Sequence, residues 1–132
     1  MIPHPADLDT KVWTDLGLDH SYKFLIWGPD FDIAENAAKW GHLSILIKQQ
    51  PIVGAIVRHR CPNYHEYAAD PERDGWHAGA IHFKTELTVA AAWEGPKWDV
   101  HSWQPLHIEP SLQSHYPCSD HGFIRGGRWE RA

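Results

Sequence analysis

Short runs of apolar residues, bounded by glycine, proline or polar residues, recur through most of this 132-residue chain. Such runs are typical of β-strands joined by tight turns, whereas an amphipathic helix needs a longer segment with apolar residues three and four positions apart. Strands are therefore expected at residues 22–27, 43–48, 52–57, 81–93, 98–103 and 106–113. The alternation is clearest over 81–93, where it predicts one long strand with a solvent-facing side.

Two adjacent glycines, Gly126 and Gly127, separate the apolar runs at 121–125 and 128–130. Both central residues of a two-residue hairpin turn need a positive φ, a conformation that glycine adopts at little cost. This spacing therefore predicts a β-hairpin at the end of the chain.

One segment favours a helix instead. Residues 31–40 are rich in alanine, Asp30 or Asp32 can cap the first turn, and Gly41 can end the helix. Together these patterns predict a mainly β fold, α+β at the margin. We expect a single-domain antiparallel β-sandwich or open barrel with one short helix and a loose lead-in over residues 1–10.

Length and composition limit the classes of function. The chain is 42% apolar and 22% charged, and its length fits one domain covering residues 1–132. The formal net charge is −5 and no run of lysine and arginine occurs, which argues against a nucleic-acid binder. No apolar run approaches the roughly 20 residues that span a bilayer, and the first residues do not resemble a signal peptide. We therefore expect a cytoplasmic protein with reduced thiols and no membrane partner.

Two Cys–His pairs have the spacing of metal ligands. Cys61 precedes His65 by four residues, and Cys118 precedes His121 by three. Together they make a set of two thiolates and two imidazoles, which suits tetrahedral zinc, with His59 and His115 as spare ligands. Two alternatives stay open: buried thiols beside loop histidines, and a Cys61–Cys118 disulfide.

A second pattern suits nucleophilic catalysis. Ser111 follows a strand-like stretch, and His121 opens the next one ten residues later. If the intervening residues return as a loop, the two side chains lie on neighbouring strands, where a neutral histidine can take the proton of the serine. A third group should orient the imidazole, and His65 is preferred over Asp120, whose neighbouring position puts it on the opposite face of a strand. Gly122 could leave backbone N–H groups free for an oxyanion. The alternative is a turn serine beside a surface histidine.

Four tryptophans lie near these segments. They could line a groove for an extended peptide, or simply fill the core. They are Trp93, Trp98, Trp103 and Trp129.

The C-terminal third resembles a known family. The stretch Leu106-His-Ile-Glu-Pro-Ser-Leu112 and the later stretch Cys118-Ser-Asp-His-Gly-Phe-Ile-Arg-Gly-Gly-Arg-Trp129 are similar to the BubE-like family of bacteria and phages, with a looser match at 61–65. The resemblance implies a serine peptidase that acts on a ubiquitin-like partner. It puts the nucleophile on Ser111, the general base on His121 and the earlier histidine on His65. Family members often have a denser cysteine pattern before the last histidine than this chain has.

Two hypotheses follow for function. The first is a BubE-like serine peptidase that uses Ser111, His121 and His65, needs no cofactor, and processes the extended C-terminal tail of a ubiquitin-like protein in a bacterial or phage-infected cell. The second is a non-enzymatic β module stabilised by zinc on Cys61, His65, Cys118 and His121, which binds a protein partner as a phage accessory or inhibitor protein. A closed zinc site would occupy the lone pair of His121 that a general base needs, so the two hypotheses exclude each other in their simplest forms. A virion component is a third, weaker idea, and the sequence does not indicate an oligomeric state.

Overall fold

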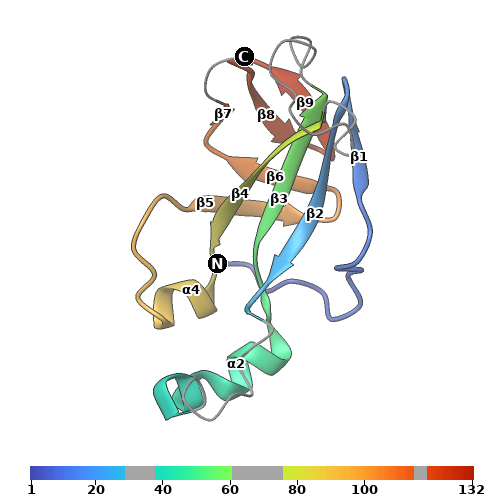
Figure 1. The fold of residues 1–132 in the computed structure, drawn as a ribbon. Helices are drawn as coiled ribbons and strands as arrows, with labels where there is room; N and C mark the ends of the chain where they lie inside the picture. The colour runs from blue at the N-terminus through green and yellow to red at the C-terminus, as the bar shows by residue number, and fades with distance from the viewer. Residues whose placement is uncertain (29–37, 61–75, 115–118) are drawn as a thin grey trace.

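The computed structural model describes residues 1–28, 38–60, 76–114 and 119–132. Strands dominate these ranges and form two sheets (Figure 1). The six-stranded sheet has the order β1 (Thr14–Gly17), β2 (His20–Ile26), β3 (Ile52–Arg60), β4 (Trp76–Lys84), β5 (Trp98–Trp103) and β6 (Leu106–Glu109). The three-stranded sheet has the order β7 (Leu112–Gln113), β8 (His121–Arg125) and β9 (Arg128–Arg131). The expected mainly β fold is confirmed.

The large sheet curls into half a barrel, and the small sheet lies across its open side (Figure 1). Strand β8 contacts β6 and strand β9 contacts β1, so the small sheet bridges the two edges of the large one. The main core fills the space enclosed in this way, with side chains from both sheets. Its fully buried members include Phe83, Leu106, Ile108 and Ile124.

Tight turns hold two hairpins in register. Gly126 and Gly127 have φ values of 56° and 73°, as the predicted turn between β8 and β9 requires. Leu18 and Asp19, between β1 and β2, also have positive φ values, of 52° and 59°. Neither central residue of this second turn is a glycine, although Gly17, directly before it, also has a positive φ of 79°.

The long strand expected over 81–93 is wrong. Strand β4 ends at Lys84, and helix α4 (Glu86–Ala90) follows. Thr85 caps the helix: its hydroxyl accepts from the Thr88 N–H at 3.1 Å, and the Thr88 hydroxyl accepts from the Thr85 N–H at 2.9 Å. Of the alternating residues, Leu87 is fully buried but Val89 is 47% exposed, so the period-two pattern does not correspond to burial.

One pair of strands departs from the antiparallel pairing that the sequence predicted, and helix α4 lies in its connection. Strands β4 and β5 pair in parallel, with Phe83 opposite Trp98. Parallel neighbours cannot be joined by a hairpin, so the chain must cross back before β5 begins, and α4 lies in that connection.

The strand expected over 43–48 is also wrong. A 3₁₀ helix, η1 (Gly41–Leu43), runs into helix α2 (Ser44–Gln49). Leu43 and Ile47, four positions apart, are buried with Leu87 in a second core cluster, while Ile45 is 68% exposed. The helix expected over 31–40 lies mostly outside the described residues, and Gly41, its predicted end, begins η1.

Candidate functional site

The structure brings Ser111 and His121 together. Ser111 directly precedes β7, and His121 is the first residue of β8, its antiparallel neighbour. The Ser111 Oγ and the His121 Nε2 lie 2.8 Å apart, within hydrogen-bonding distance. The backbone carbonyl of Ser111 also accepts from the indole N–H of Trp98 at 3.3 Å, which ties the serine to β5.

This contact has the geometry of a nucleophile and its base. When the Ser111 hydroxyl donates to Nε2, the imidazole is neutral and its lone pair points at the proton to be removed. A third group would bond Nδ1, but none does so among the residues that the structure describes. His65, the predicted third member, falls within 61–75, outside the described residues.

The pair lies on the solvent side of the small sheet. Along β8, Gly122 and Ile124 are buried, while His121, Phe123 and Arg125 face outward. The Phe123 ring lies 6.5 Å from that of His121, and the guanidinium of Arg125 lies 3.8 Å from the Phe123 ring centre. The outward face of β8 thus carries an imidazole, an aromatic ring and a cation in sequence.

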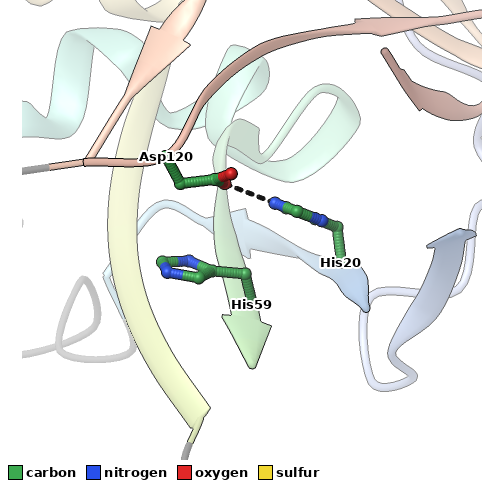
Figure 2. Close-up of side chains that lie close together, drawn as sticks. All are labelled: His20, His59 and Asp120. Carbon is green, nitrogen blue, oxygen red and sulfur yellow. Dashed lines mark hydrogen bonds and ion pairs between the residues drawn. The ribbon is translucent and has the colours of Figure 1, made fainter. Parts of the chain in front are cut away.

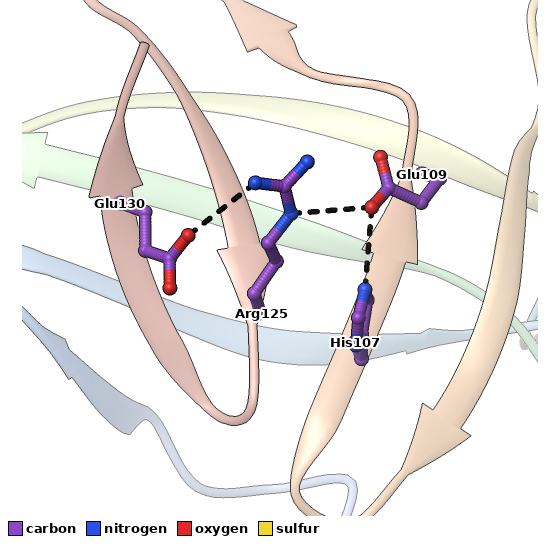
Figure 3. A network of polar contacts seen from close by, with 4 residues as sticks. All are labelled: His107, Glu109, Arg125 and Glu130. Carbon is purple, nitrogen blue, oxygen red and sulfur yellow. Dashed lines mark hydrogen bonds and ion pairs between the residues drawn. The ribbon is translucent and has the colours of Figure 1, made fainter.

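A polar network holds Arg125 in place (Figure 3). Its Nε lies 3.2 Å from Glu109 Oε1, and its second contact is Glu130 at 3.5 Å. Glu109 also bonds His107 at 3.3 Å. The hydrogen bond from His107, and then that from Arg125, hold the pKa of Glu109 below its ordinary value. Glu109 therefore stays ionised and holds Arg125 on the outward face of β8, at the opposite end of the strand from His121.

Gly122 has a packing role in place of the expected oxyanion role. It lies in the central strand of the small sheet, between Leu112 of β7 and Arg131 of β9, so its N–H is directed along the sheet toward a neighbouring strand. A Cβ on Gly122 would lie 2.5 Å from the Glu130 carbonyl oxygen and 2.6 Å from the Trp129 ring. The missing side chain lets the Trp129 indole lie against the strand.

Three of the four predicted zinc ligands fall outside the described residues. Cys61 and His65 lie within 61–75, and Cys118 within 115–118, as does the spare ligand His115. The fourth, His121, directs its Nε2 at Ser111. The four-ligand zinc site therefore stays a prediction.

The four tryptophans do not share one cavity, since Trp98 and Trp129 line one and Trp103 lines another. Trp103 and Trp129 are buried in the main core, and Trp98 packs against it. Trp93 is 42% exposed and packs against His82. Ordinary core packing accounts for Trp98, Trp103 and Trp129.

A second cluster of titratable side chains was missed by the sequence analysis. His20, His59 and Asp120 converge behind β8, and one ligand atom from each lies within 4.8 Å of the others (Figure 2). His20 begins β2 and pairs with His59 of β3, which in turn pairs with His77 of β4. The cluster lines a cavity of about 440 Å³. No local motif signals it, because its members are dozens of residues apart in the chain.

Comparison of the chain with models of known protein families, with curated proteins and with solved structures finds no match. The BubE-like resemblance therefore rests on the short C-terminal motifs and the looser match at 61–65.

In the described part of the chain, no helix has the length and apolar character needed to cross a membrane.

Proposed function

We propose that this protein is a serine hydrolase of the peptidase type, with Ser111 as nucleophile and His121 as general base. The observation that carries the proposal is the 2.8 Å contact between Ser111 Oγ and His121 Nε2. A serine is a weak nucleophile unless a base lies within hydrogen-bonding distance, and the His121 imidazole lies at that distance from Ser111. His121 is exposed and Ser111 is half-buried, so the proposal places the substrate carbonyl at the open side of this pair.

The proposed reaction runs in two halves. In the first, Oγ of Ser111 attacks the substrate carbonyl carbon while Nε2 of His121 takes the hydroxyl proton, and the proton passes to the leaving amine as its C–N bond breaks. In the second, water attacks the acyl-enzyme and gives a proton to His121. The carbon–Oγ bond then breaks, and Ser111 regains the proton. The chain itself supplies both catalytic groups, and the reaction consumes one water.

The sheet edge beside the nucleophile supports an extended substrate. Strand β7 pairs with β8 on one side and is an edge of the three-stranded sheet. An extended peptide can add to such an edge through main-chain hydrogen bonds, and here it would pass Ser111 at the start of β7. The family resemblance adds the proposed substrate: the C-terminal tail of a ubiquitin-like protein, in the cytoplasm of a bacterial or phage-infected cell.

The test is covalent labelling of the purified protein with a fluorophosphonate, which reacts with an activated serine, followed by cleavage of ubiquitin-like proteins that carry a C-terminal extension. Ser111→Ala should abolish labelling and cleavage. His121→Gln should slow both by about 10²- to 10⁴-fold, the contribution of a positioned general base.

Ser114→Ala is the matched control. The Ser114 hydroxyl contacts the backbone of Asp120 and is bonded to none of the histidines that the structure describes. The Ser114→Ala variant should be labelled like the wild type. The proposal fails if the wild-type protein is not labelled and cleaves no tail, or if Ser111→Ala is labelled like the wild type.

A further inference from the structure

The cluster behind β8 has the composition and placement of a metal site. His20 comes from the start of β2, His59 from the end of β3, and Asp120 from the residue before β8 (Figure 2). Their ligand atoms lie within 4.8 Å of one another. Donor atoms about 2.1 Å from a tetrahedral ion are about 3.4 Å apart, so small side-chain rotations would bring all three to one ion.

Both ring nitrogens of His20 face hydrogen-bond acceptors, a backbone carbonyl and a carboxylate. Its Nδ1 lies 2.6 Å from the carbonyl oxygen of Leu18, which can only accept, so Nδ1 carries a hydrogen. Its Nε2 faces the Asp120 carboxylate, which is also an acceptor. The contact between Nε2 and the carboxylate therefore needs a positive species, which is either a proton on Nε2 or a metal ion in its place. Metal-binding histidines commonly have this arrangement, with the other ring N–H donated to a backbone carbonyl.

His59 supplies a second, independent observation. Its side chain is only 8% exposed, and its Nε2 has no hydrogen-bond partner in the described structure. Buried polar atoms are almost always bonded, and an unsatisfied one calls for an explanation such as an ion. Its ring centre lies 5.5 Å from that of His20, so its edge reaches the same cluster.

The surroundings favour a cation over other ways of satisfying Asp120. Among the described residues that line the cavity, none is a lysine or an arginine, and Asp120 is the one carboxylate. The Trp129 ring stacks on His20 with its centre 4.0 Å away and covers one side of the cluster. All three candidate ligands line the cavity, so an ion held by them would keep an open position toward it.

We propose that His20, His59 and Asp120 bind one divalent first-row transition-metal ion, such as Zn²⁺, with an open coordination position facing the cavity. Two imidazoles and a carboxylate suit such ions, whereas Mg²⁺ and Ca²⁺ prefer all-oxygen sites. This site shares no residue with the Ser111–His121 pair or with the four ligands predicted around the cysteines, and it includes His59, which that prediction named only as a spare ligand. An ion here would link β2 and β3 to the start of β8.

The experiment is titration of chelator-treated protein with ZnCl₂ in a calorimeter. The wild type should bind one ion per chain through this site. His59→Asn and Asp120→Asn should weaken that binding by more than about 100-fold, because each loses a direct ligand and even indirect supporting contacts are worth 10- to 100-fold. His101→Asn, an exposed histidine of β5 outside the cluster, should bind like the wild type.

Two further arms separate this site from the alternatives. Cys61→Ser/Cys118→Ser should keep the ion, and so should Ser111→Ala. Cobalt added to the wild-type protein should give ligand-field bands without a sulfur-to-cobalt charge-transfer band, a result that does not depend on any variant folding. The proposal is overturned if the wild type binds no ion, if His59→Asn binds as tightly as the wild type, or if the cobalt spectrum shows thiolate ligation. Labelling of Ser111 is measured separately, so each proposal can fail alone.

Discussion

Asp120 and His121 are neighbours in the chain, but their side chains lie on opposite faces of the small sheet. The Asp120 carboxylate points inward to His20, and the His121 imidazole points outward to Ser111. This follows from the alternation of side chains along an extended backbone. The Ser111–His121 pair and the His20–His59–Asp120 cluster therefore lie on opposite sides of the chain at the start of β8.

Substitutions at these two positions should have separable effects. His121→Gln should suppress serine labelling and leave zinc affinity unchanged. Asp120→Asn should weaken zinc binding and lower the free energy of unfolding of the metal-free protein by about 1–2 kcal/mol, because His20 loses a charged hydrogen-bond partner. Serine labelling, calorimetry with zinc and urea denaturation of both variants check this. If both variants lost labelling and zinc affinity alike, the two sites would not be independent.

Gly122→Ala should destabilise the small sheet. Its Cβ would lie 2.5 Å from a backbone oxygen and 2.6 Å from the Trp129 ring, so strands or ring must move. Overpacking of this kind costs about 1–3 kcal/mol. Gly79→Ala is the control, because a Cβ there meets nothing within 4 Å. Urea denaturation should show a large decrease in the free energy of unfolding for Gly122→Ala and little or none for Gly79→Ala.

Thr88→Val should destabilise the start of α4. The Thr88 hydroxyl is buried, donates to the Phe83 carbonyl at 2.8 Å and accepts from the Thr85 N–H at 2.9 Å. Valine has nearly the same shape but makes neither bond, and a buried N–H that loses its partner costs about 1–3 kcal/mol. Val89→Thr, at an exposed position of the same helix, should change the midpoint of thermal unfolding far less.

His82 should make stability depend on pH. Burial lowers the pKa of His82 below its ordinary value of 6.5. As the pH falls through that value, the unfolded chain takes up a proton that the native state resists, so native stability is full above it and decreases below it. His82→Gln should flatten the decrease between about pH 7 and pH 5. Part of the slope should remain, because burial also lowers the pKa of His59. Urea denaturation across this range is the measurement, and an unchanged slope in His82→Gln would contradict the assignment.

Local sequence signals predicted the features that depend on neighbouring residues. The paired glycines predicted the β8–β9 turn, and the apolar runs predicted most strands of both sheets. The proximity of Ser111 to His121 was also accessible, because ten residues separate them and a returning loop places them on paired strands.

Where local signals were ambiguous, tertiary packing determined whether a segment formed a helix or a strand. In 43–48 and 81–93 the apolar residues fit both a strand and a helix, since Leu43 and Ile47 are four positions apart and Leu87 precedes Ala91 by the same spacing. Both segments became helical where these residues bury against one another in the second core cluster. The hydrophobic periodicity of a short segment does not show which of its apolar residues will have a neighbouring element to pack against.

The cluster of His20, His59 and Asp120 behind β8 depends on tertiary structure alone. His20 and His59 meet because β2 and β3 pair in one register, and Asp120 reaches them only because the small sheet closes over the curled large sheet. The sequence by itself determined that the chain forms short strands, a glycine hairpin and a nearby serine and histidine, since those depend on local backbone preferences. Strand pairing and sheet closure determined which distant side chains share a buried space, because that depends on contacts between residues far apart in the chain.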